Sequence, residues 1–156
     1  MAAEIVLEDK QIKAFFTNTL KNLKSIKDGE SKFIGIVGAS VFKDVMDHFS
    51  KQEGQDGAWA PWSKVYQQHM MRIGRQGNKK LQFTGRLRQT FKPTDSKVVS
   101  GGLVWYNNAM TKDGFPYAQA HDEGIGSPQR EFMWLSKSAV ETIAKQIVDF
   151  TLEAGV

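Results

Sequence analysis

Cysteine is absent from this chain of 156 residues. Its absence excludes disulfide bonds, thiolate metal sites and thiol nucleophiles, and it suits a protein that assembles in a reducing cytoplasm. Long apolar runs are lacking too, since no stretch approaches the roughly 18–20 residues that cross a bilayer. Residues 1–9 are acidic and soon turn polar, unlike a secretion signal. We therefore expect neither a membrane span nor a secreted, disulfide-stabilised fold.

Histidine is scarce, and the three histidines do not have the spacing of common metal sites. His48, His69 and His121 match no pattern of zinc ligands. No serine stands in the Gly-x-Ser-x-Gly elbow of hydrolases, and Gly35–Ser40 lacks the spacing and the lysine of a phosphate-binding loop. Two acids follow His121 directly, but adjacent residues on a helix do not face one another, which disfavours a small hydrolase centred there. We expect no enzyme activity, no metal and no cofactor.

The remaining composition is that of an ordinary folded protein. Apolar residues make up 40% of the chain and charged residues 24%. For this mass, surface scaling predicts that folding leaves roughly 7,900 Å² exposed and buries about two thirds of the surface of the unfolded chain. There is no internal repeat, linker or low-complexity tract. We therefore expect one domain spanning residues 1–156.

Two segments in the first third of the chain have the apolar spacing of helices with one buried face. The first helix is predicted over Glu8–Ile26, with Asp9 as its N-cap, and the second over Ser31–Gln52. Gly35 and Gly38 in the second helix would let a neighbouring backbone approach closely, at about 1 kcal/mol of helix propensity each. The predicted buried stripe of this helix consists of Phe33, Val37, Val41 and Val45.

The second half of the chain alternates short apolar runs with turns. A β-hairpin is predicted over Lys97–Tyr106, with pairing that begins as early as Phe91, and a further strand around Phe132–Leu135. Thr84 is placed to cap a short helix, and Tyr117–Glu123 is predicted to form a helical turn. Together with the helices, these elements predict an α+β fold in which amphipathic helices pack on a small, mainly antiparallel sheet.

A last helix is predicted to begin near Ser136 or Ser138. Ser138 and Glu141 have the spacing of a capping box, in which two side chains satisfy free backbone N–H groups at a helix start. The predicted buried stripe consists of Val140, Ile143, Ile147 and either Phe150 or Thr151. This helix would complete the second side of the fold.

Positive charge is concentrated in the middle of the chain. Residues 57–94 hold eight lysines and arginines and no acid, whereas six acids face three bases after His121. One interpretation is a face that binds the phosphates of nucleic acid. The other is electrostatic complementarity between copies, in which the middle of one subunit meets the end of the next. The charge pattern alone leaves both open.

Short motifs punctuate the region beyond the second helix. Gly57–Ser63 contains two tryptophans around a proline, and residues 74–80 have the polar composition of an exposed loop. The later motifs are Thr-Gly-Arg-Leu-Arg at 84–88, Tyr-Ala-x-x-His-x-x-Gly at 117–124 and Pro-x-Arg-x-Phe at 128–132. Each motif is short, so the order of all four carries more information than any one of them.

In this order the motifs resemble those of the phage virion morphogenesis family, the tail-completion proteins of Mu-like and P2-like phages. The resemblance runs from about Phe33 to the C-terminus and covers the helix over residues 1–29 only weakly. It implies a non-enzymatic virion protein of the tail or neck, made in the host cytoplasm, that forms a closed ring such as a hexamer or dodecamer. It also implies tail-tube, tail-terminator or head–tail connector proteins as partners, with packaged DNA as a further possible contact. A basic nucleic-acid-binding module is the alternative function.

The suspected interface combines the motif residues with the basic loop. Aromatic side chains would supply binding energy, and planar arginines would pair with carboxylates of a neighbour. The suspected interface residues are Trp59, Trp62, Arg75, Lys79, Lys80, Arg86, Arg88, Tyr117, His121, Arg130 and Phe132.

Overall fold

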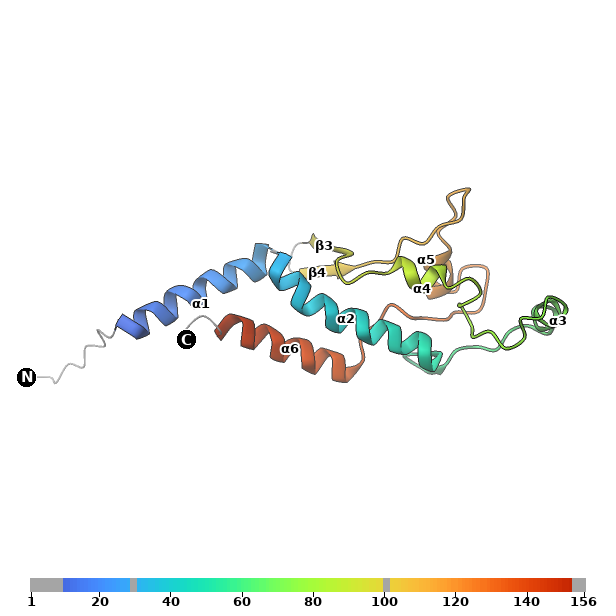
Figure 1. Ribbon diagram of the computed structural model, residues 1–156, viewed down its shortest axis with the longest axis horizontal. Helices are drawn as coiled ribbons and strands as arrows, with labels where there is room; N and C mark the ends of the chain where they lie inside the picture. Colours follow the sequence, from blue (N-terminus) through green and yellow to red (C-terminus); the bar gives the residue numbers. More distant parts are fainter. Residues whose placement is uncertain (1–9, 29–30, 100–101, 153–156) are drawn as a thin grey trace, which may run out of the picture.

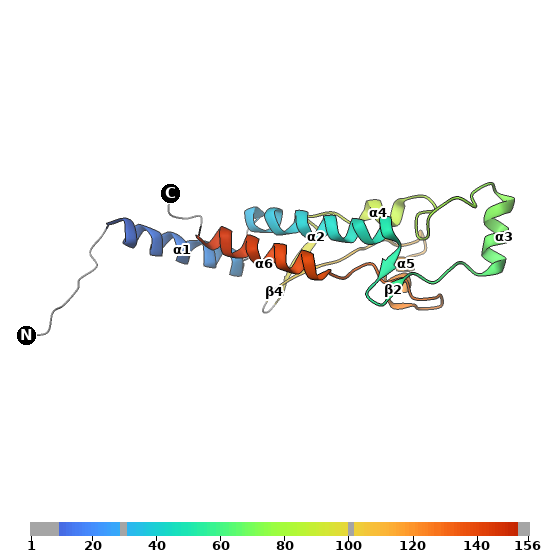
Figure 2. The ribbon, with the colours of Figure 1, turned by 90° about the horizontal axis from the view of Figure 1, so that it is seen from below.

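The structure, a computed structural model that describes residues 10–28, 31–99 and 102–152, has the predicted α+β fold (Figure 1). Within these residues six helices combine with two separate antiparallel pairs of strands. The elements are spread along one long axis, with α1 at one end and α3 at the other (Figures 1 and 2). Their bounds are α1 Lys10–Asp28, α2 Ser31–Lys51, β1 Glu53–Gly54, β2 Gly57–Ala58, α3 Lys64–Arg72, α4 Arg86–Thr90, β3 Ser96–Val99, β4 Gly102–Trp105, α5 Tyr117–Glu123 and α6 Lys137–Leu152.

The three long helices form the frame of the molecule, and all three were predicted. α6 lies beside α2 and also contacts α1 (Figures 1 and 2). The side-chain amide of Asn22 on α1 donates to the carbonyl oxygen of Phe150 on α6 at 2.7 Å. The predicted cap Asp9 lies outside the described residues. None of the helices in the described ranges is both long enough and apolar enough to cross a membrane.

The core is built around α2. The predicted stripe of this helix is buried, as the spacing required, and Phe49 at its C-terminal end is fully buried. The Phe49 ring lies 5.7 Å from the ring of Trp59 and 5.0 Å from that of Phe132, between ring centroids. At the other end, Phe150 of α6 lies 5.5 Å from Phe33. Aromatic contacts thus join α2 to both the middle and the end of the chain.

The start and buried face of α6 differ in detail from the prediction. Val140 is 50% exposed, and Ala139 takes the buried position next to it. The cap is Ser136 rather than Ser138, because the hydroxyl of Ser136 accepts a hydrogen bond from the Ala139 N–H at 3.2 Å. The hydroxyl of Ser138 contacts that of Ser136 at 3.1 Å instead of closing a capping box. Further along the helix, Phe150 is buried as predicted.

The region between α2 and α4 holds regular elements that the sequence analysis missed. β1 and β2 pair as a minimal hairpin after α2. Ser63 then caps α3, its hydroxyl accepting from the Tyr66 N–H at 3.2 Å. Residues 74–80 contain no helix or strand, as predicted for this loop.

The main hairpin and α4 are present with shifted boundaries. β3 pairs with β4 from Ser96 onward, so pairing does not begin at Phe91. Gly85 occupies the N-cap of α4 with φ 74°, a left-handed conformation that glycine adopts without strain. Thr84 does not occupy that position, although its hydroxyl accepts from the Arg86 N–H at 3.3 Å. Leu87 and Phe91 are buried, as their spacing predicted.

The strand predicted around Phe132–Leu135 does not form. Instead, the carboxylate of Asp122 accepts hydrogen bonds from the N–H groups of Phe132 and Met133 at 2.8 and 2.9 Å. One side chain therefore takes up two donors that a partner strand would otherwise need. α5, which carries Asp122, is the predicted helical turn and ends at Gly124 in the left-handed conformation.

Candidate interaction site

The four motif segments converge on one cavity of about 500 Å³. Its walls come from the start and inner face of α3, the segment from 79 to 87, α5 and residues 127–130. Each motif contributes at least one side chain: Trp62, Arg86, Tyr117 with His121, and Arg130. Segments up to about 70 residues apart in the chain thus meet where the sequence alone showed only an order of motifs.

Arg130 fastens two of these segments together. Its side chain is only 7% exposed. Its Nε donates to the Ala60 carbonyl oxygen and its Nη2 to the Pro61 carbonyl oxygen, both at 3.1 Å. Burial lowers the pKa of Arg130, while the nearby Tyr66 raises it. The guanidinium is therefore engaged inside its own chain, which corrects the expectation that it offers free donors to a neighbour.

Trp59 and Phe132 belong to the core, in contrast to the exposed anchors that we expected. Trp59 is 4% exposed, and its indole N–H donates to the carbonyl oxygen of Glu131 at 2.8 Å. Phe132 has no exposed surface at all. Both side chains hold the motif segments against α2 and cannot contact a neighbour without unpacking the core.

The basic residues of the suspected interface have different environments. Arg88 directs its Nε to the sulfur of Met46 at 3.2 Å, and Lys79 donates to the Ser50 carbonyl oxygen at 3.2 Å. Arg75 donates to the Phe83 carbonyl oxygen at 3.0 Å and lies 4.7 Å from the centre of that ring. Lys80 lies outside the cavity, whereas Lys79 and Arg86 line it.

His121 is half-buried on the cavity wall. Its Nδ1 lies 3.5 Å from the Ser127 hydroxyl, and its carbonyl oxygen accepts from the Arg130 N–H at 2.8 Å. Burial, and then the charge of Arg130, lower the pKa of His121 below its ordinary value of 6.5. The imidazole is therefore neutral at pH 7.

This shift predicts a loss of stability on acidification. As the pH falls below about 6.5, the unfolded chain takes up a proton at residue 121 before the folded chain does, so the free energy of unfolding decreases. We expect His121→Gln to lose less stability than the parent between pH 7.5 and 5.5, as measured by urea unfolding. His69→Gln, which changes an exposed histidine, is the control and should keep the slope of the parent. Equal slopes for the parent and His121→Gln would contradict the assignment.

The residues that the sequence analysis missed lie on α3. Tyr66 and Met70 line the cavity, and Met70 is fully buried. The ring of Tyr66 meets that of Trp62 edge-on, with centroids 5.4 Å apart. The signal was the four-residue spacing of Trp62, Tyr66 and Met70, which places them on one helical face behind the cap Ser63.

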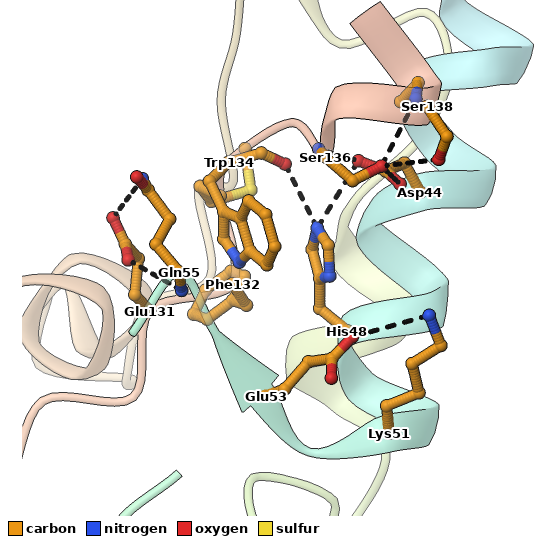
Figure 3. Close-up of polar contacts among 12 residues, drawn as sticks. Asp44, His48, Lys51, Glu53, Gln55, Glu131, Phe132, Trp134, Ser136 and Ser138 are labelled. Atoms are coloured by element: carbon orange, nitrogen blue, oxygen red, sulfur yellow. Dashed lines mark hydrogen bonds and ion pairs between the residues drawn. The ribbon is translucent and has the colours of Figure 1, made fainter. Parts of the chain in front are cut away.

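A second polar cluster, at the start of α6, contains a serine, a histidine and an aspartate (Figure 3). The Asp44 carboxylate accepts from the Ser136 hydroxyl at 2.6 Å and from the Ser136 N–H at 2.7 Å. His48 Nε2 lies 3.4 Å from the same carboxylate and 3.2 Å from the Trp134 carbonyl oxygen. In a catalytic triad the histidine stands between the serine and the acid, but here the serine bonds the acid directly. The cluster attaches α6 to α2 and leaves the serine without a base.

Among the described residues, no group of three histidine, aspartate or glutamate side chains could hold a metal ion. Comparison with known proteins gave no matching family model, no matching curated protein and no matching solved structure.

Proposed function

We propose that this chain is a structural protein of a tailed phage or prophage that completes the tail or neck by assembling as an oligomeric ring. The motif order supports the proposal, because the segments that resemble the tail-completion family form one continuous site. The observation that carries it is the position of α3, an amphipathic helix held at the far end of the molecule (Figures 1 and 2). We refer to residues 63–80, which contain α3 and the following loop, as the α3 arm.

The outer face of the α3 arm is unusually apolar for a surface exposed to water. Val65 is 77% exposed and Met71 is 56% exposed, while Met70 on the inner face is buried. The chain exposes 10,956 Å², about 3,000 Å² more than expected for a compact monomer of this mass. Excess surface with apolar side chains at one end is typical of a subunit that buries that end against a partner.

A ring also requires that two different faces of the subunit meet. The arm belongs to residues 57–94, which carry eight positive charges and no acid. The chain after His121 carries six acids and three bases, so the two regions attract one another between copies. Unlike charge on two separate faces favours head-to-tail contact over a face-to-face dimer.

The arm predicts where assembly can be broken. Replacing Val65 and Met71 together with serine removes exposed apolar side chains, so we expect folding to persist and the oligomer to dissociate. Sedimentation or native mass measurement over a range of concentrations checks this outcome. Ile125→Ser is the matched control, because Ile125 is 53% exposed but lies outside the arm.

The contrary result is a parent chain that remains a monomer at every concentration and also when mixed with the tail and neck proteins of its own phage. The charge of residues 57–94 favours nucleic-acid binding as the second candidate function. That candidate predicts retention on DNA or RNA at low salt and a steep loss of affinity as salt rises. A monomer that behaves in this way would replace the proposed function with the second one.

A further inference from the structure

The cavity between α3, α4 and α5 combines aromatic walls with positive charge. Trp62, Tyr66, Phe83 and Tyr117 supply rings, and Lys79, Arg86 and Arg130 supply cationic groups. No aspartate or glutamate is among its lining residues. A volume of about 500 Å³ is in the range of cavities that hold a small ligand or the tip of a peptide.

Arg86 is the cation of this cavity that remains available to a ligand. Arg130 is occupied by the carbonyl oxygens of Ala60 and Pro61, and Lys79 gives one hydrogen bond to Ser50. The side chain of Arg86 is exposed and has no hydrogen-bond or ion-pair partner in the part of the chain that the structure describes. Because the pKa of His121 is lowered, the histidine contributes no charge near neutral pH.

This arrangement suits a carboxylate attached to apolar groups. One planar guanidinium matches a carboxylate with two parallel hydrogen bonds, and the aromatic walls accept aliphatic side chains beside it. A nucleotide phosphate carries more charge and is usually met by several free donors. With one free arginine and one partly used lysine, the cavity fits the carboxylate better.

The sequence contains a segment of this chemistry outside the described residues. Residues 4–9, Glu-Ile-Val-Leu-Glu-Asp, carry three acids, three adjoining aliphatic side chains and no base. They cannot reach the cavity of their own chain. α1 and α2 lie one after the other between Lys10 and the cavity, and together they extend roughly 60 Å (Figures 1 and 2). Nine extended residues span at most about 32 Å.

We propose that the cavity binds residues 4–9 of a second copy of this chain, with Arg86 pairing one of the acidic side chains. The inference rests on the proposed ring, because it names a head-to-tail contact between neighbouring copies. One subunit presents its acidic, apolar segment beyond α1, and the next subunit receives it at the opposite end, beside the α3 arm.

The test uses a fluorescently labelled peptide of residues 3–10 added to the full chain, with binding followed by anisotropy. Arg86→Gln should weaken binding about tenfold, the loss expected for one charge-assisted pair. Arg72→Gln is the matched control, since Arg72 is exposed and does not line the cavity, and it should bind as the parent does. A peptide with glutamine or asparagine at its acidic positions should bind weakly.

Equal weakening by Arg86→Gln and Arg72→Gln would overturn the inference, as would equal binding of the neutral peptide. Displacement of the acidic peptide by adenosine monophosphate at comparable concentration would overturn it in favour of a nucleotide site. If the chain forms oligomers but the peptide does not bind, the cavity inference fails and the ring proposal stands. If the peptide binds while the chain stays a monomer with all tail and neck proteins, the ring proposal fails.

Discussion

Trp59→Ala is expected to lower the free energy of unfolding by about 3–5 kcal/mol, the range for losing a large buried aromatic side chain. The indole is almost completely buried, and its ring meets Phe49 edge-on with centroids 5.7 Å apart. Its N–H also donates to the carbonyl oxygen of Glu131. Removing the side chain therefore leaves a cavity beside α2 and an unpaired carbonyl oxygen in the segment that precedes Phe132. Urea unfolding followed by far-ultraviolet circular dichroism measures the loss without depending on tryptophan fluorescence.

Trp62→Ala is the matched control, because Trp62 belongs to the same motif but is only half-buried on the cavity wall. We expect it to cost about 1 kcal/mol. Trp59→Phe should fall between the two, since it keeps a ring against Phe49 but loses the hydrogen bond to Glu131. If the two alanine variants were equally stable, the assignment of Trp59 to the core and Trp62 to the surface would be wrong.

The long helices could be predicted from the sequence because each buries a continuous stripe. Phe33, Val37 and the two valines that follow at four-residue spacing define the face of α2 without reference to the rest of the chain. α3 was missed for the opposite reason. It has nine residues, and within it only Met70 is buried, so burial leaves almost no periodic signal in its sequence.

The false strand at Phe132–Leu135 shows a second limit. An apolar run of four residues fits a strand, but the outcome depends on whether a partner strand is available. Here Asp122, ten residues earlier on α5, occupies the backbone donors of the run, and Trp59 occupies the carbonyl oxygen of Glu131. These contacts span long sequence separations, so no local pattern indicates them.

The candidate site was predictable in membership but not in roles. The motifs pointed to Trp62, Arg86, Tyr117 and His121, which the fold does bring to one cavity. Arg86 and Arg130 looked equivalent as exposed donors in the sequence. Only the fold reveals that the Arg130 guanidinium is spent on two carbonyl oxygens while that of Arg86 remains open to solvent.

Gly38→Ala is expected to destabilise the fold by about 1–3 kcal/mol, although alanine is the better helix former. A Cβ at position 38 of α2 would lie 2.3 Å from the carbonyl oxygen of Pro93, so the two backbones would have to separate. That same oxygen accepts the indole N–H of Trp105 at 2.8 Å, and the shift would strain this bond at the base of the β3–β4 hairpin. Urea unfolding measures the loss.

Gly35→Ala provides the control within the same helix. A Cβ at position 35 would meet no atom within 4 Å, so only the gain in helix propensity remains, and stability should rise by about 0.5–1 kcal/mol. The two variants make the same chemical change one turn apart and are expected to have opposite signs. A rise for both would mean that Pro93 does not approach α2 as closely as the structure has it. The hairpin, and with it the path of the chain from α4 toward the cavity, would then be held by other contacts.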